Sequence, residues 1–230
     1  DEFEDQLTDK MIFEKERKLK HLLATDPNYK DSEIVYTDQS WDDQSQREFL
    51  QIISGETDRL SALVSDLLDL SRIEAGDINV SRSACDFEGL IHRASQRAHP
   101  QPGDRLRLEI TSVLPELELD VRRIEVVMRN LIENATKYAG QDSPIRVCVN
   151  LSNGILVVKV EDEGPGIPDD ESARIFESFY RLEGDTTHTT PGLGLGLSIC
   201  QGFIKAHGGE IWTEPRETGA CIAFSIPINS

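Results

Sequence analysis

A glycine-rich turn that leads directly into an amphipathic segment constrains this chain more than any other feature. The turn holds Gly192, Gly194 and Gly196, separated by Leu193 and Leu195. Glycines lack a Cβ and adopt dihedral angles closed to other residues, so the backbone can approach a bound group closely. The unpaired N–H groups of the following helix carry partial positive charge and point back at the turn. This arrangement suits a phosphate chain, although glycine repeats also form flexible loops.

The composition is acidic and limits the partners of the chain. Its 230 residues include 42 acidic and 24 basic ones, so the net charge is −18. A surface of this kind repels nucleic acid and anionic membranes, and we expect no nucleic-acid partner. A nucleotide is also anionic, so its site would have to be built locally from backbone dipoles and a metal ion.

The apolar content indicates a chain that folds around a core, and its first residue indicates a piece of a longer protein. The hydrophobic content of 38% is sufficient for a core, and no apolar run is long enough to span a bilayer. The chain begins at Asp1 without a signal peptide, so we interpret it as excised from a longer protein. The four cysteines, Cys85, Cys148, Cys200 and Cys221, form no C-x-x-C pair, which argues against a zinc site. Three of them lie in apolar segments, which predicts core residues of a protein in a reducing compartment.

From about residue 44 to residue 75, apolar residues repeat in steps of three and four, as in a helix that packs against other helices. Residues 1–23 are also compatible with a helix, whereas residues 25–43 have no period and are predicted to form a loop. Gly76 is expected to end the long helix. The apolar stripe consists of Ile53, Leu60, Leu63, Leu67 and Leu70, widened by Val64 and Leu68.

Beyond Cys85 the period alternates between that of helices and that of strands. Asn153-Gly154, between two alternating segments, predicts a β-hairpin. Mixed helices and strands with hairpins indicate an α/β sandwich, in which helices cover one face of a mixed sheet. The predicted helices are 87–98, 121–138 and 196–207, and the predicted strands are 106–110, 145–151, 155–162, 210–213 and 220–226.

Two asparagines on the predicted helix 121–138 lie four residues apart and therefore share one face. The amide oxygens of Asn130 and Asn134 suit a hard cation such as Mg²⁺, which also takes phosphate oxygens and waters. Lys137 and Tyr138 follow one turn later, where Lys137 could meet a phosphate as a point charge. For Asn130 taken alone, an exposed polar residue is the simpler interpretation.

An acidic residue ends the apolar face of a predicted strand. Three apolar residues of the segment 155–162 share one face, and Asp162 falls on that face as well. A carboxylate there is costly unless a group donates a hydrogen bond to it, and the exocyclic amine of a purine would do so. The alternative is that Asp162 caps the turn that contains Gly164 and Gly166.

Together these segments resemble the nucleotide-binding domain of sensor histidine kinases, within the wider ATPase and kinase superfamily that includes gyrase. Residues 130–138 resemble the N box of the family, 162–166 its G1 box, 176–181 its F box and 192–196 its G2 box. All four motifs occur in the order found in the family. The resemblance implies a Bergerat-type ATP-binding fold with ATP and Mg²⁺ as cofactors.

The resemblance also implies roles for the matching residues. Asn134 would ligate Mg²⁺ with help from Asn130, and Asp162 would accept a hydrogen bond from adenine. Residues 181–191 would form a mobile lid over ATP. The residues expected at the nucleotide are Asn130, Asn134, Lys137, Tyr138, Asp162, Gly164, Gly166, Ile167, Phe179, Arg181, Gly192, Leu193, Gly194, Leu195 and Gly196.

Asn130 distinguishes the chain from the hydrolytic members of the superfamily. Those members, such as gyrase, have at this position a glutamate that activates water. An amide cannot act as a general base. The site is therefore predicted to hold ATP and to pass on its γ-phosphoryl group, a transfer that relies on positioning and charge neutralisation.

Residues 60–76 resemble the second helix of the dimerisation and phosphoacceptor hairpin of the same family. Two such hairpins form a four-helix bundle, so the resemblance implies a homodimer and an α+β chain, with the hairpin at 1–78 and the ATP-binding domain at 79–230. It further implies an ATP-dependent protein histidine kinase, a response regulator as partner and a sensor region that this chain lacks. We expect a cytoplasmic region, from a protein either anchored in the inner membrane or free of it.

The phosphoacceptor histidine is the part of the family pattern that this chain matches least. The family has a His-Glu-Leu-Arg-x-Pro block, and the nearest counterpart is His21, which is followed by Leu22 in place of the acid. Three interpretations stay open: residues missing from the sequence, a divergent acceptor at His21, or an ATP-binding regulator that acts by protein–protein contact. A Ser/Thr kinase or an ATPase of the superfamily is a further alternative. His207, by contrast, is interpreted as a helix-end residue favoured by the helix dipole.

Overall fold

The structure is a computed structural model that describes residues 43–98, 101–140, 142–182 and 193–228. Contacts divide the chain into two units, Asp1–Ser54 and Gly55–Ser230, of which the first is described only from residue 43. His21, the expected helix at 1–23, the expected loop at 25–43 up to residue 42, Gly192 and most of the expected lid lie outside the described residues, whereas Asp43, the last residue of that loop, begins a helix. In the part of the chain that is described, no helix has the length and apolar character needed to span a bilayer.

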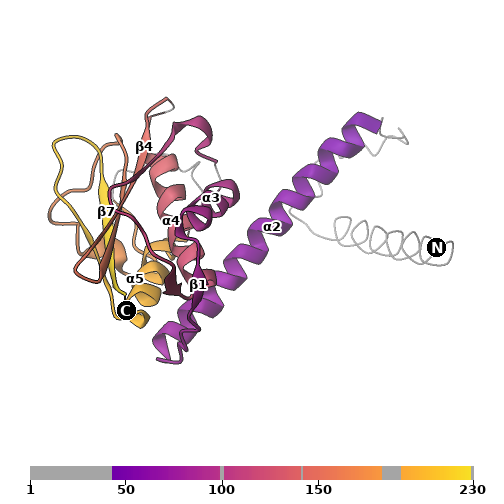
Figure 1. Ribbon diagram of the computed structural model, residues 1–230. Coiled ribbons are helices and arrows are strands. Elements are labelled where there is room, and N and C mark those ends of the chain that lie inside the picture. The colour runs from indigo at the N-terminus through magenta and orange to yellow at the C-terminus, as the bar shows by residue number, and fades with distance from the viewer. Residues whose placement is uncertain (1–42, 99–100, 141, 183–192, 229–230) are drawn as a thin grey trace. The chain divides into compact units, whose positions relative to one another are not determined.

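A five-stranded mixed sheet forms the centre of the second unit (Figure 1), with the strand order β2-β4-β5-β7-β6. The first neighbours, β2 and β4, run parallel, and every other neighbouring pair is antiparallel. The predicted hairpin is confirmed, because Asn153 and Gly154 join β4 to β5 with positive φ angles of 53° and 74°. The strands are β2 Leu106–Ile110, β4 Ile145–Ser152, β5 Ile155–Glu161, β6 Glu210–Thr213 and β7 Cys221–Pro227.

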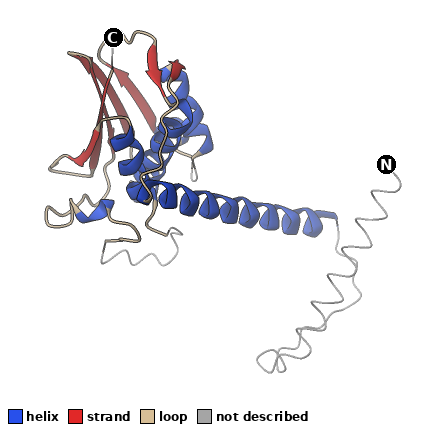
Figure 2. Cartoon of the chain, turned by 90° about the horizontal axis from the view of Figure 1, so that it is seen from below, coloured by secondary structure: helices blue, strands red, loops and turns tan. Residues whose placement is uncertain are grey.

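Three helices cover one face of this sheet, as predicted (Figure 2). They are α3 Phe87–Arg97, α4 Val121–Tyr138 and α5 Gly196–Ala206. Two of them begin after an aspartate whose side chain accepts a hydrogen bond from the first turn: Asp86 caps α3 and Asp120 caps α4. The residues of β4, β5 and β7 that face the helices alternate with those of the other face, and Val147, Val158 and Phe224 are completely buried among them.

A small second sheet was not expected from the sequence. It consists of β1 Ser83–Cys85 and β3 Leu117–Leu119, which pair antiparallel. Three residues are too few to show a period of two, so the pattern gave no signal. Each strand leads directly into the capping aspartate of a helix, and because the two strands run antiparallel, the starts of α3 and α4 lie at opposite ends of the pair. Two short 3₁₀ turns, Gly103–Arg105 and Arg174–Phe176, complete the elements between residues 43 and 228.

The cysteines Cys85, Cys200 and Cys221 are buried, which confirms the prediction that three of the four are core residues, and Cys148 is half-buried. All four carry free thiols. Burial raises the pKa of the Cys200 thiol to about 12, so this cysteine is a neutral packing residue at physiological pH.

The long helix α2, Asp43–Glu74, has two apolar faces within the second unit. One face packs on the core: Leu70 is buried there, and Ile73 lies so close to Gly202 of α5 that an added Cβ would meet it at 2.6 Å. The other face is exposed. It carries the four residues that we call the α2 stripe: Leu60, Val64, Leu67 and Leu68, which are between 45% and 61% exposed.

Candidate functional site

The second half of α4 provides the polar side chains at the centre of the candidate site. Asn130 is 7% exposed, and its Nδ2 donates a hydrogen bond of 3.3 Å to the carbonyl oxygen of Gly196. Asn134 lies one turn further along the same helix and is half-buried. The structure thus joins the first asparagine of the N box to the last glycine of the G2 box. The interpretation of Asn130 as an exposed surface residue is wrong.

Asp162 follows the end of β5 and is 7% exposed. Its Oδ1 accepts hydrogen bonds from the backbone N–H groups of Gly164, at 2.8 Å, and of Ala220, at 3.3 Å. Both bonds fall on one oxygen, so Oδ2 remains to accept from a ligand. Burial raises the pKa of this carboxyl, and the two backbone donors partly offset the effect. The turn-capping alternative is therefore correct for one oxygen, and it is compatible with a ligand contact at the other.

The remaining motifs meet through close backbone contacts. A Cβ added at Gly164 would lie 2.5 Å from the carbonyl oxygen of Tyr138, so the G1 box touches the end of the N box. A Cβ added at Gly194, whose φ is 71°, would lie 2.6 Å from the carbonyl oxygen of Tyr180. The N–H of Phe179 also donates to the carbonyl of Gly194 at 3.0 Å. The G1 and G2 boxes therefore both contact the second half of α4, and the F box contacts the G2 box.

The expected ligand-facing residues differ in exposure. Lys137, Gly164, Gly166, Ile167, Gly194 and Gly196 are half-buried, and Leu195 belongs to the core. The more exposed ones are Tyr138, Phe179, Arg181 and Leu193, of which Phe179 is 60% exposed and has a φ of 66°. A positive φ is costly for an aromatic residue, and here the Gly194 contact holds the backbone in place.

Gly219 and Ala220 also belong to the site, although the sequence analysis missed them. Gly219 has a φ of 73°, and a Cβ added there would lie 1.8 Å from the carbonyl oxygen of Asp162. Gly166 in turn approaches the carbonyl of Gly219, at 3.0 Å from an added Cβ. The segment before β7 thus packs directly against the backbone of Asp162 and of the G1 turn. The signal in the sequence that could have indicated this close backbone contact was the Gly-Ala pair just before the last strand.

The expectation that His207 is favoured by the helix dipole is wrong. His207 does end α5, but it is only 2% exposed, and burial lowers its pKa. A dipole contribution would require the charged imidazolium, which this environment disfavours.

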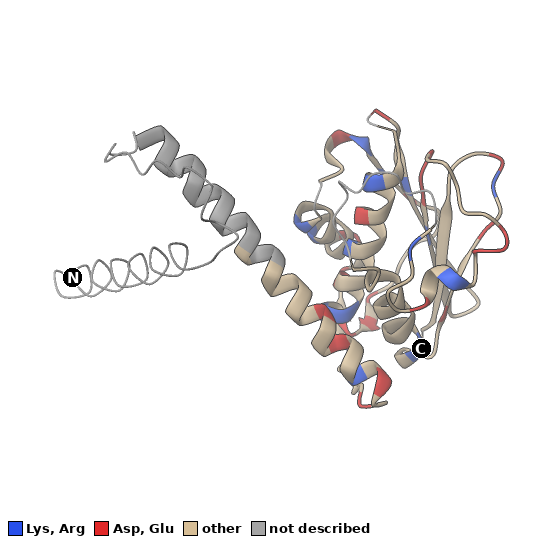
Figure 3. Cartoon of the chain, turned by 180° about the vertical axis from the view of Figure 1, so that it is seen from behind, with Lys and Arg blue, Asp and Glu red and all other residues tan. Residues whose placement is uncertain are grey.

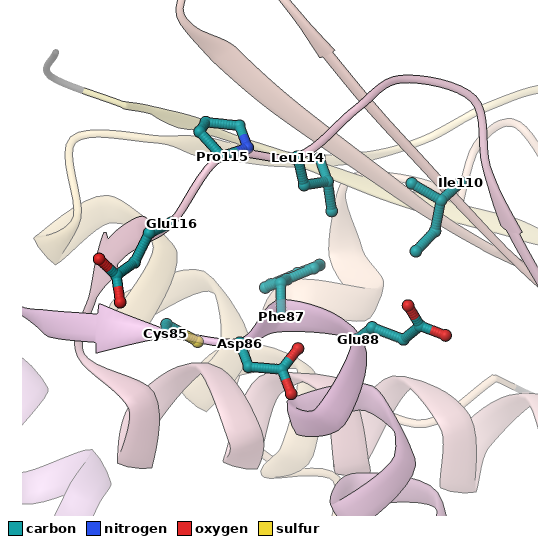
Figure 4. A pocket seen from close by; sticks show the side chains of 8 residues that line it. All are labelled: Cys85, Asp86, Phe87, Glu88, Ile110, Leu114, Pro115 and Glu116. Carbon is teal, nitrogen blue, oxygen red and sulfur yellow. The ribbon is translucent and has the colours of Figure 1, made fainter.

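A separate cavity of about 500 Å³ lies at the other end of the sheet (Figure 4). Ile110, which lines it, pairs with Val149, whereas Asp162 follows the strand residue that pairs with Arg146. The cavity contains none of the motif residues. Its lining residues are Cys85, Asp86, Phe87, Glu88, Ile110, Leu114, Pro115 and Glu116.

Charges are interspersed along the helices and loops of the described part (Figure 3). Near the G1 turn, Glu161 forms ion pairs with Arg146 at 3.4 Å and with Arg216 at 2.8 Å. Among the described residues, no group of three or more His, Cys, Asp or Glu side chains could hold a metal ion. A cation at this site would therefore depend on amide oxygens and on the ligand itself. Fold and site together define a nucleotide-binding α/β sandwich.

Comparison with known proteins identifies two families along the chain. Residues 119–230 match the histidine kinase-, DNA gyrase B- and HSP90-like ATPase family, and residues 33–76 match the His Kinase A (phospho-acceptor) domain. The sensor protein KdpD of Escherichia coli is 35% identical over 72% of this chain, and the sensor histidine kinase WalK of Bacillus subtilis is 33% identical over 78%. The chain belongs to the sensor histidine kinases.

Solved structures agree with this assignment. Full-length ShkA in complex with AMPPNP superposes with a TM-score of 0.68 at 29% identity, over 84% of this chain and 40% of that one. Histidine kinase ThkA in complex with the response regulator protein TrrA gives a TM-score of 0.60 at 26% identity, over 83% of this chain and 53% of that one. The chain spans only 18% of KdpD and 30% of WalK.

Proposed function

We propose that this chain binds Mg·ATP and transfers the γ-phosphoryl group to a histidine, from which it passes to an aspartate of a response regulator. The observation that carries the proposal is the joining of the four motifs: the G2 and G1 boxes contact α4 through the contacts of Asn130 with Gly196 and of Tyr138 with Gly164, and the F box contacts the G2 box through Phe179 and Gly194. The family of the chain supports the same activity. The complex of ThkA with TrrA supports a response regulator as the partner.

Each expected residue has a role in this proposal. The free oxygen of Asp162 accepts from the adenine amine, with Gly164, Gly166 and Ile167 around the base. Asn134 and Asn130 hold Mg²⁺, since amide oxygens, phosphate oxygens and water form a ligand set that suits this ion. The ion would neutralise charge on the transferred phosphoryl group. The residues assigned to the phosphates and to the lid side are Lys137, Tyr138, Phe179, Arg181, Gly192, Leu193, Gly194, Leu195 and Gly196.

Transfer rather than hydrolysis follows from the chemistry of Asn130. Its amide donates to the Gly196 carbonyl and has no basic nitrogen to take a proton from water. The ATP-binding regulator considered above shares the nucleotide site, but the match of residues 33–76 to a phospho-acceptor domain favours the kinase.

The phosphoacceptor test is a labelling experiment. Residues 33–76 contain no histidine, and His21 is the candidate acceptor ahead of them. We expect incubation with γ-labelled ATP to give a label that is labile in acid and stable in base, and His21→Gln to abolish it. His92→Gln, a change at an exposed histidine of α3, is the matched control and should keep the label. A label that survives His21→Gln excludes His21, and the absence of label with ATP still bound contradicts the kinase proposal.

We further propose a homodimer that buries the α2 stripe, with a domain boundary near residue 78 and a location in the cytoplasm. Burial of a leucine contributes about 1.5–3 kcal/mol, and two leucines per protomer are involved. We expect the double variant Leu60→Glu/Leu67→Glu to raise the dimer dissociation constant at least about hundredfold, measured by light scattering over a concentration series.

The control for the dimer experiment adds the same charge to the same helix. Ala62 and Ser65 are exposed and lie off the α2 stripe by the helical period. The double variant Ala62→Glu/Ser65→Glu should therefore dimerise like the wild type. Equal dissociation constants for the two double variants would show that the α2 stripe is not the dimer interface.

A further inference from the structure

Helices α4 and α5 pack side by side in opposite directions, and polar contacts join them at both ends. At the nucleotide end, Asn130 donates to the carbonyl of Gly196. At the far end, the backbone N–H of Asp120 donates to Nε2 of His207 at 3.3 Å. Between these ends, the Cys200 thiol contacts the carbonyl of Val127, and Arg123 lies over the ring of Phe203. The two end contacts therefore define how far α5 is shifted along α4.

The hydrogen bonds of His207 require one protonation state. Its Nε2 accepts from the N–H of Asp120, so this nitrogen carries no proton. Its Nδ1 lies 2.7 Å from the carbonyl oxygen of Phe203, which can only accept, so the proton is on Nδ1. A second proton on Nε2 would oppose the N–H of Asp120 and break the contact between the helices. His207 must be neutral for the two helices to stay joined at this end.

The charged groups around His207 connect this contact to the segment that enters the domain. Arg82 donates to the backbone carbonyl of His207 at 3.2 Å, and the N–H of Ser81 donates to the Asp120 carboxylate at 3.1 Å. Arg123 lies 3.7 Å from the same carboxylate. Asp120 favours protonation of His207, and Arg82 and Arg123 oppose it, but burial is the largest influence and lowers the pKa of His207.

We propose that neutral His207 is a positioning residue for the nucleotide site: by accepting from Asp120 it fixes the position of α5 on α4, and with it the place of the glycine turn relative to Asn130 and Asn134. This inference rests on the proposed ATP site. His207 touches no ligand itself and acts through α5, whose first residue contacts Asn130.

Substitutions at His207 test its hydrogen bond by keeping or removing an acceptor for Asp120. Glutamine can place its side-chain oxygen where Nε2 lies, so His207→Gln keeps an acceptor for Asp120. Asparagine is polar but too short to reach that position. We expect the Kd for AMPPNP with Mg²⁺ to stay within about threefold of the wild type in His207→Gln and to rise about three- to thirtyfold in His207→Asn. His92→Gln again serves as the exposed control and should leave the Kd unchanged.

The pH dependence gives a readout that a packing role would not produce. Because the pKa of His207 is lowered in the folded protein, the neutral form and its bond persist above the ordinary value of 6.5 and are lost as the pH falls through the folded pKa. Glutamine does not titrate, so the His207→Gln variant lacks this pH dependence. The ratio of the wild-type Kd to the His207→Gln Kd, taken at each pH, should therefore rise as the pH falls below 6.5. Imidazole ¹⁵N shifts should show a proton on Nδ1 alone at neutral pH.

The outcomes are distinct. A wild type that fails to bind AMPPNP overturns the proposed function and this inference with it. A wild type that binds, with equal Kd values for His207→Asn and His207→Gln, overturns the inference alone. If His207→Asn fails to fold, the pH series still tests the inference: a ratio of the wild-type Kd to the His207→Gln Kd that stays constant with pH overturns it. A proton on Nε2 of His207 at neutral pH also overturns the inference.

Discussion

Asp162→Asn is expected to weaken binding of ATP by about hundredfold or more. Oδ1 of Asp162 is occupied by the N–H groups of Gly164 and Ala220, and the asparagine oxygen can keep those two bonds. The amide nitrogen then stands where Oδ2 was and presents a donor to the adenine amine, which is also a donor. A lost hydrogen bond to a charged acceptor costs about 1.5–3 kcal/mol, and two facing donors add to that cost.

Titration calorimetry with AMPPNP at a fixed Mg²⁺ concentration measures this effect. Glu163→Gln is the matched control, because Glu163 is the exposed neighbour and the same charge is removed. The melting temperature of Asp162→Asn should stay near that of the wild type, since the backbone contacts of Oδ1 persist. Undiminished affinity in the folded Asp162→Asn variant would exclude the assigned adenine contact.

Gly219→Ala is expected to destabilise the domain by about 3 kcal/mol or more and to remove ATP binding with it. A left-handed residue other than glycine costs about 1–2 kcal/mol, and the added Cβ would also lie 1.8 Å from the carbonyl oxygen of Asp162. The clash is with backbone at the end of a central strand, so the strand end or the turn before β7 must move. Either movement displaces Asp162 from its support by Ala220.

Thermal unfolding followed by circular dichroism should show a fall in melting temperature of about 6–12 °C for Gly219→Ala. Gly103→Ala isolates the backbone contribution, because Gly103 also has a positive φ, of 58°, but an added Cβ there meets no atom within 4 Å. This control should lose only about 1–2 kcal/mol. Similar losses in the two variants would show that the close approach to Asp162 is not what requires glycine at residue 219.

Elements with a long and regular pattern were predictable. The helix at 121–138 was predicted with the bounds that the structure shows, since apolar residues repeat with the helical period along its eighteen residues. The hairpin at Asn153-Gly154 followed from the turn residues and the alternating segments on either side of them. The small sheet of β1 and β3 could not be predicted, because two strands of three residues have no period and pair only when the chain between them has folded.

The candidate site also has a part that could be predicted from the sequence and a part that could not. The sequence by itself determined which residue types are present and in what order: the asparagines of α4, the acid after a strand and the glycines before a helix, each with a chemistry that suits one part of Mg·ATP. Only the tertiary structure decided how they meet. Gly219 and Ala220 stand 57 and 58 positions after Asp162 in the sequence yet support it directly, and His207 joins α5 to a helix cap 87 positions earlier. Contacts of this kind depend on the pairing of strands and the packing of helices, which are cooperative properties of the whole domain and leave no periodic trace in the residues that make them.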